Sequence, residues 1–154
     1  MNILNSYLRS KMDLSHIGFQ RGSKEGGYFC TPLHSRVIGW TGVDGIHFCT
    51  VKGLDDIIFA VNPTYEPGDY VHPVARNFED FLRLILAFGS AELSAQSARL
   101  SENEYGRLLE LEWRRPHHDL DGLGRRLFLT PIQNPFTYTH MAGQLIDCTR
   151  IVRR

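Results

Sequence analysis

The sequence lacks an excess of charge of either sign, and this balance argues against nucleic acid as a partner. Its 154 residues include 17 basic and 17 acidic ones, whereas a general nucleic-acid-binding protein carries a basic excess, because phosphate neutralisation supplies most of its affinity. Lysine is scarce and occurs only at Lys11, Lys24 and Lys52. The other basic residues are arginines, whose side chains suit paired contacts with carboxylates. This preference for arginine indicates a protein-contacting surface; the alternative is a composition bias of the genome.

Cysteine is also scarce, and its spacing excludes two common uses. Cys30, Cys49 and Cys148 lie far apart in the chain and form no C-x-x-C pair. The sequence therefore predicts neither a disulfide framework nor a zinc site. Cys49 lies in the apolar run IHFCTV, where a small buried side chain is its expected role.

Long hydrophobic runs are absent as well. No stretch approaches the roughly 20 apolar residues that a membrane span needs. Residues 1–20 are polar and interrupted, without the apolar centre of a signal peptide. We therefore expect a cytoplasmic protein without a membrane partner.

The signatures of common enzymes are missing. There is no G-x-S-x-G nucleophile motif, and GSKEGG at 22–27 lacks the GK[ST] ending of a phosphate-binding loop. His47 and Cys49 share a strand face and are near enough to interact, but no third residue orients them. A buried thiol near a hydrogen-bonded histidine is the preferred interpretation, and we expect neither catalysis nor a cofactor.

Three short segments rich in β-branched and aromatic residues predict strands: RVIGWTGV (36–43), IHFCTVKG (46–53) and IIFAVN (57–62). Asp44-Gly45 predicts a tight type I′ hairpin turn between the first two. Gly53, with Asp55 and Asp56, is expected to supply the second reversal. The segments therefore predict an antiparallel meander of at least three strands.

The alternation of side chains along these strands predicts how the sheet is covered. In the middle strand, one face is expected to carry Ile46, Phe48 and Thr50, and the other His47, Cys49 and Val51. The run IIFAV is apolar on both faces. We therefore expect that other parts of the chain cover the sheet on each side.

Helices are the expected cover. NFEDFLRLILAFG (77–89) has a good N-cap in Asn77, acids in its first turn and Gly89 just past its end. SENEYGRLLELEWRR (101–115) opens on the capping-box pair Ser101 and Glu104, and Gly106 weakens it by about 1 kcal/mol. Its apolar side comprises Tyr105, Leu108, Leu109 and Trp113.

The ends of the chain give weaker patterns. Residues 2–13 predict a short amphipathic helix, and 18–29 a polar, glycine-rich loop. Beyond Pro116, we expect a short helix over 117–129, a proline-broken segment over 130–140 and a final strand over 145–154. With 42% hydrophobic and 22% charged residues, the chain is predicted to form one α+β domain, in which helices flank an antiparallel sheet.

The connection VNPTYEPGDYVHPVARNFEDFL (61–82) holds more chemistry than a spacer requires. Its prolines stiffen it, which lowers the entropy lost when it binds, and tyrosine is enriched in binding hot spots. We therefore predict a partner-binding loop made by Tyr65, Glu66, Asp69, Tyr70 and Arg76. In the alternative, the tyrosines pack on the sheet edge, while Asp69 and His72 hold the loop internally.

A second hypothesis is a small metal-dependent enzyme. Asp44 and His47, and again Asp69 and His72, have a D-x-x-H spacing, and His117-His118 adds a histidine pair. A metal site requires these side chains to converge. Asp44 is already explained as the first residue of its turn, so we expect no metal. A third hypothesis is a dimerising module, which uses helix faces that the sheet leaves uncovered.

Two strings in this region are similar to strings of a bacterial branch of the SUKH superfamily. G-x-D-G-I-H matches Gly42 and Asp44–His47, and V-H-P-x-A-R-x-F-x-D-F-L matches residues 71–82. The resemblance covers roughly residues 28–98.

The resemblance implies an α+β fold and a non-catalytic role. Members are commonly intracellular immunity proteins that bind and neutralise toxin domains, and others are interaction scaffolds. The usual opening, a helix followed by leucine-proline and then a helix ending in asparagine-glycine, is missing here, and the binding surfaces vary between members. We therefore predict one SUKH-like domain over 1–154 that binds another protein, more narrowly a toxin domain, without a specific toxin being implied.

Overall fold

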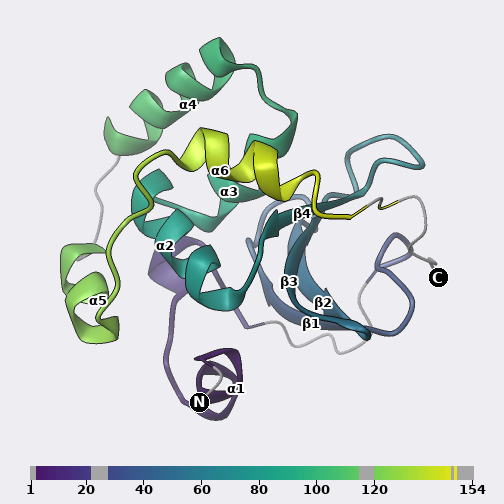
Figure 1. Ribbon diagram of the computed structural model, residues 1–154, viewed down its shortest axis with the longest axis horizontal. Helices are drawn as coiled ribbons and strands as arrows, with labels where there is room; N and C mark the ends of the chain where they lie inside the picture. The colour runs from purple at the N-terminus through teal and green to yellow at the C-terminus, as the bar shows by residue number, and fades with distance from the viewer. Residues whose placement is uncertain (1–2, 22–27, 115–119, 147, 149–154) are drawn as a thin grey trace.

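A computed structural model describes residues 3–21, 28–114, 120–146 and 148 of the chain (Figure 1). Within these residues, a four-stranded antiparallel sheet with strand order β1-β2-β3-β4 is accompanied by six α-helices. The predicted α+β fold is confirmed. None of the helices in these ranges combines the length and the apolar character needed to cross a bilayer.

The three predicted strands are β1 (Ser35–Trp40), β2 (His47–Val51) and β3 (Leu54–Val61). A fourth strand, β4 (Val71–Ala75), pairs antiparallel with β3. It lies in the segment that was expected to be only a connection. Pro73 has no N–H to donate, which suits the outermost position of β4 in the sheet.

The turns follow the local sequence closely. Asp44 and Gly45 have φ angles of 52° and 71°, as a type I′ turn requires, and the Ile46 N–H donates to the Val43 carbonyl at 3.0 Å. At the second reversal, Gly53 has a φ of 86°. The expectation that Asp55 and Asp56 belong to this turn is wrong, because both already lie in β3.

The two best-marked helices are confirmed. In α2 (Phe78–Phe88), the Asn77 side chain accepts from the Asp80 N–H at 2.7 Å, and Gly89 ends the helix with a φ of 92°. In α4 (Glu102–Arg114), the Ser101 hydroxyl accepts from the Glu104 N–H at 3.2 Å. Both helices therefore begin where their caps predict.

The remaining helices are only partly foreseen. Helices α1 (Ile3–Arg9) and α5 (Leu120–Leu127) confirm the predictions near both ends. Unpredicted are α3 (Ala91–Gln96), η1 (Ser15–Ile17) and η2 (Ser97–Arg99). The segment 130–140 is not simply broken by proline: Pro135 opens α6 (Pro135–Ala142), because the first helical position needs no N–H. GSKEGG, His117-His118 and most of the expected final strand lie outside the described residues.

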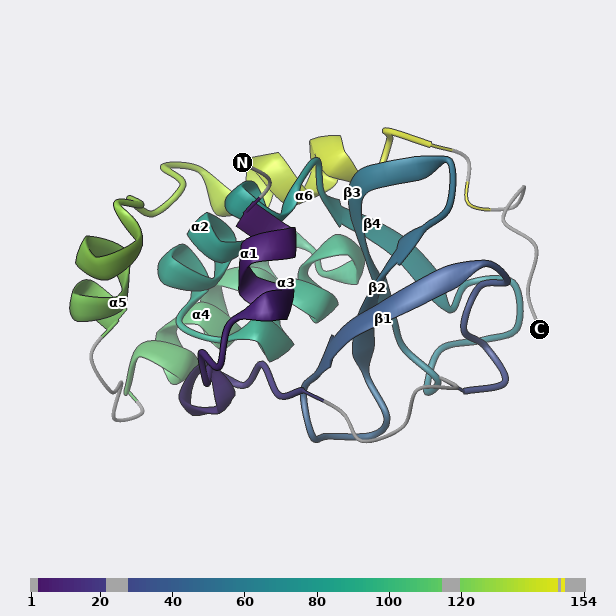
Figure 2. The same cartoon turned by 90° about the horizontal axis from the view of Figure 1, so that it is seen from below.

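The two faces of the sheet belong to two separate cores. The helices gather against one side of the sheet (Figure 2), where Phe48, Ile58 and Ala60 join the larger core. Phe59 and Val61 face the other way, into a smaller core. The prediction that β3 is covered on both faces is confirmed. The expectation that helices supply the cover holds for one face only, because Tyr28, Cys30 and Ile146, which lie outside the α-helices, cover the other.

The smaller core brings the three cysteines together. Cys30 and Cys49 are both fully buried in it, and Cys148 packs against it. Burial, and to a lesser extent the neighbouring Cys148 and Cys30, raises the pKa of Cys49 to about 12. The expected burial of Cys49 is confirmed, whereas spacing in the sequence concealed that the three thiols lie around one core.

Candidate functional site

The loop between β3 and β4, residues 62–70, is closed by its own hydrogen bonds. The Asn62 N–H donates to the Tyr70 carbonyl at 2.8 Å, and the Asp69 N–H donates to the Glu66 carbonyl at 2.9 Å. The buried Asn62 side-chain carbonyl accepts from the Thr64 N–H at 3.0 Å and from the Thr64 hydroxyl at 2.7 Å. The loop is therefore ordered before any partner arrives.

Asp69 ties this loop to the helical side of the molecule. Its carboxylate pairs with the Arg99 guanidinium of η2 and lies 3.3 Å from His72 Nε2. Burial lowers the pKa of His72, so its ring is neutral near pH 7, and Nε2 donates to the Asp69 carbonyl oxygen at 2.8 Å. Asp69 and His72 thus hold the loop internally, as the alternative interpretation of this stretch proposed.

Tyr65 also takes part in this internal packing. Its ring meets the His72 ring edge-on at 5.9 Å, and the Arg99 guanidinium carbon lies 4.9 Å from its centre. Burial raises the pKa of Tyr65, while a hydrogen bond with Asn62 and the charge of Arg99 oppose this rise. Tyr65 is half-buried and offers a partner only part of its ring.

Phe29 is an exposed aromatic residue of this region, and it packs on the half-buried Tyr70. Their ring centres are 5.6 Å apart at 90°, and Phe29 is 64% exposed. Tyr70 packs at the margin of the smaller core, and Glu66 at the loop tip is exposed. We call Phe29, Glu66 and Tyr70 the aromatic edge. Phe29 was missed because it ends a polar, glycine-rich stretch, where nothing local indicates a contact with residue 70.

Arg76 does not join the other predicted residues. It follows β4, so the five residues of that strand, about 16 Å, separate it from the loop. There its guanidinium lies over the Tyr138 ring at 5.6 Å, and its backbone N–H donates to the Tyr138 hydroxyl at 3.0 Å. The predicted loop site therefore contains Tyr65, Glu66, Asp69 and Tyr70, with Arg76 at the opposite end of the strand.

The four side chains of the metal hypothesis do not converge. His47 pairs across the sheet with Val61, whereas His72 pairs with the adjacent Ala60. Since neighbouring strand residues point to opposite faces, the two histidines lie on opposite sides of the sheet. Over the described ranges, His, Cys, Asp and Glu side chains form no group of three or more that could hold a metal.

His47 has hydrogen-bonding partners other than Cys49. Its Nε2 lies 2.9 Å from the Thr31 hydroxyl, and its Nδ1 lies 2.8 Å from the Gly45 carbonyl oxygen. Its ring packs on Trp40 with the ring centres 4.4 Å apart. Burial lowers its pKa, so His47 acts as a neutral residue that holds the hairpin turn.

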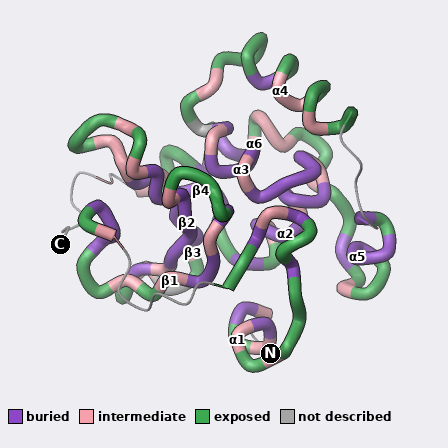
Figure 3. The backbone as a smooth tube through the Cα atoms, turned by 180° about the vertical axis from the view of Figure 1, so that it is seen from behind, coloured by how far each residue is buried: buried purple, intermediate pink, exposed green. Residues whose placement is uncertain are grey.

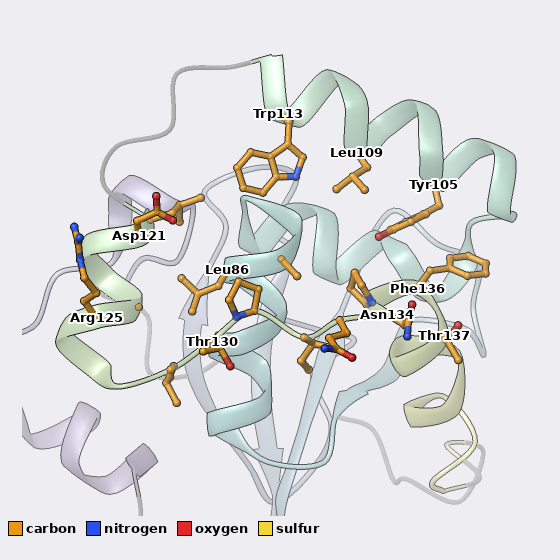
Figure 4. Close-up of a pocket in the computed structure, with 18 of the residues that line it drawn as sticks. Leu86, Tyr105, Leu109, Trp113, Asp121, Arg125, Thr130, Asn134, Phe136 and Thr137 are labelled. Carbon is orange, nitrogen blue, oxygen red and sulfur yellow. The ribbon is translucent and has the colours of Figure 1, made fainter.

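A second candidate site, which the sequence did not indicate, is a groove of about 1130 Å³ on the helical side (Figure 4). Helix α4 forms one wall with Tyr105, Leu109 and Trp113. The other walls come from α5 and from residues 129–137, with Leu86 of α2 in the floor. The groove was missed because it forms only where α2, α4 and α5 pack together in the tertiary structure.

Comparisons of the chain with protein-family models, with curated proteins and with solved structures find no match. The SUKH relationship therefore stays a prediction, and the geometry of the described residues carries the functional argument.

Proposed function

We propose that this protein is a non-catalytic, cytoplasmic protein-binding domain, and more narrowly an immunity protein that neutralises a toxin domain by one-to-one binding. The observation that carries the proposal is the aromatic edge, in which exposed Phe29 packs on Tyr70 beside an already ordered loop. The resemblance to the SUKH superfamily supports the narrower form.

The energetics favour binding at this edge. Association costs free energy for each loop and side chain that it orders, and here Asn62 and Asp69 have already ordered the loop. Aromatic residues dominate the binding energy of many interfaces. An ordered loop with two packed rings therefore gives a partner apolar area at a low entropic cost.

The residues that carry the resemblance have structural roles. Gly42 and Gly45 have φ angles of 80° and 71° in the first hairpin, and Pro73 lies in β4. In this chain the two strings therefore form a hairpin turn, the strand β4 and the start of α2. The binding surface has to be argued separately from the aromatic edge, because such surfaces vary between members.

The test begins with the reading frames beside its gene: the product of any that is toxin-like is purified and titrated calorimetrically with the full chain. The wild-type protein should bind one-to-one. Phe29→Ala and Tyr70→Ala together should weaken binding by about 1–4 kcal/mol, or about 5- to 1000-fold. Met141→Ala, which truncates a side chain that is 65% exposed on α6, is the matched control and should leave affinity unchanged.

Two results would contradict the proposal in different ways. If Phe29→Ala and Glu66→Lys both leave binding unchanged, the aromatic edge is not the interface, although the protein still binds the toxin-like domain. No binding of the toxin-like domain, together with no rescue of cells that express it, would remove the immunity function itself. Because Phe29 and Glu66 are exposed, their replacement should not disturb folding.

A further inference from the structure

The groove beside α4 is lined by three hydrophobic side chains of this helix, which differ in how far the fold buries them. Helix α4 has thirteen residues, and Tyr105 is the one that is buried; much of the helix surface faces outward (Figure 3). Leu109 is half-buried, and Trp113 is 48% exposed. All three side chains line the groove at spacings of four residues, which places them on one helix face.

The far rim of the groove carries a strained residue. Phe128, which follows α5, has a φ of 56° and is 94% exposed. The left-handed conformation costs a non-glycine residue roughly 1–2 kcal/mol, and glycine is the usual residue just past a helix. A fully exposed phenylalanine there contributes little to folding, and it lines the groove. Strain of this kind, when observed, is a reason to look for a binding role.

The charges that line the groove are not balanced along its length. On α5, Asp121 and Arg125 lie one turn apart and offset each other. Glu102 lies at the other end, one turn before Tyr105 on α4. Within the described part of the chain, Glu102 makes no ion pair. The groove is therefore lined mainly by apolar side chains, with the polar Gln133, Asn134 and Thr137 among them, and the Glu102 carboxylate near Tyr105 has no ion-pair partner among the described residues.

We propose that this groove binds an amphipathic helix of a partner protein, with a lysine or arginine of that helix against Glu102. This surface is distinct from the aromatic edge. Apolar residues three or four apart on the bound helix would contact Leu109, Trp113 and Phe128, as in other helix-in-groove complexes. The basic side chain complements the lone carboxylate.

The size of the groove agrees with this occupant. Residues Tyr105 to Trp113 span about 12 Å of helix. A helix of that length, with its side chains, fills roughly 900–1400 Å³, and the groove measures about 1130 Å³. A small ligand is normally enclosed on most sides, whereas Trp113 and Phe128 stay exposed at the rims. The open shape therefore suits a protein segment better.

The experiment selects helical peptides on the full-length wild-type protein. The probes are peptides of about 16 residues from a display library, long enough to form a helix. Their apolar positions are randomised, and their end positions carry Lys, Glu or Gln. Enriched sequences should share apolar residues at helical spacing and one terminal Lys. Trp113→Ala should weaken their binding at least about tenfold. Leu111→Ala is the control and should leave binding unchanged, because Leu111 is 53% exposed on the same helix but does not line the groove.

Charge reversal tests the orientation. Glu102→Lys should change the selected terminal residue from Lys to Glu, whereas Glu110→Lys, on the same helix outside the groove, should keep the preference for Lys. Trp113 and Glu102 are exposed, so both variants should fold, which circular dichroism can verify.

Several outcomes would overturn the inference. These are a selection that enriches no helical pattern, peptides that bind the Trp113→Ala variant equally well, and a terminal charge preference that Glu102→Lys leaves unchanged. A second copy as occupant would appear in sedimentation as a dimer that Trp113→Ala dissociates. A small apolar ligand would appear as Trp113-dependent binding of anilinonaphthalene sulfonate without any peptide binding. The toxin-domain titration uses different variants, so either proposal can fail without the other.

Discussion

Replacing Gly39 with alanine should destabilise the protein, because β1 lies directly against a buried aromatic ring. A Cβ at position 39 would lie 2.4 Å from Phe19 Cε2 and 2.5 Å from Cζ. Contacts under 3.0 Å are essentially never observed, so the ring or the strand would have to move. Phe19 is fully buried.

The surrounding rings leave Phe19 little room to move. Its ring centre lies 5.7 Å from that of Tyr7, 5.8 Å from Phe48 and 5.4 Å from Phe81. Overpacking of a filled core costs about 1–3 kcal/mol. In a chain of 154 residues, each kcal/mol corresponds to about 2–4 °C in Tm, so Gly39→Ala should lower Tm by about 2–12 °C.

Gly106→Ala is the matched control, since it adds the same methyl group. Gly106 lies inside α4, and an added Cβ would meet no atom within 4 Å. Alanine favours helix over glycine by about 0.8–1 kcal/mol, so this variant should raise Tm by about 2–4 °C. The assay is thermal unfolding followed by circular dichroism and calorimetry. A Gly39→Ala protein as stable as the wild type would refute the packing of Phe19 on β1.

Two further predictions concern the loop and the hairpin turn. Asp69→Asn weakens the contacts with Arg99 and His72, so it should cost about 1 kcal/mol and speed hydrogen exchange of residues 62–70; unchanged exchange would show that these contacts do not order the loop. Burial lowers the pKa of His47 in the native protein, so near pH 6.5 its side chain becomes protonated in the unfolded chain but stays neutral in the folded one. The free energy of unfolding should therefore fall as the pH drops below about 6.5. His47→Gln should make that decline shallower in urea unfolding measured from pH 7.5 to 5, and an equally steep decline would contradict a buried neutral His47.

Much of the fold follows from signals that act within a few residues. The Asp44-Gly45 turn and the Asn77 cap were predicted correctly because backbone conformation and capping depend on adjacent residues. The two-sided burial of β3 could be predicted because its apolar run has no polar face.

Proline caused the main errors. The same residue type ends one element and opens another. Pro73 is tolerated in β4 because that strand is outermost in the sheet, and this position cannot be read from neighbouring residues. Pro135 opens α6 because its missing N–H is not needed there, and Asn134 directly before it is a local helix-start signal that was overlooked.

The composition of the predicted loop could be read from the sequence, and the roles of its residues could not. Tertiary packing engaged Asp69 with Arg99, placed Phe29 on Tyr70 and separated Arg76 from both. It also opened the groove where α2, α4 and α5 meet. The sequence by itself determined the turns, the caps and the alternation of the strands, because these depend on neighbouring residues. Only the tertiary structure decided which side chains meet and which surfaces stay uncovered, because those contacts join residues tens of positions apart.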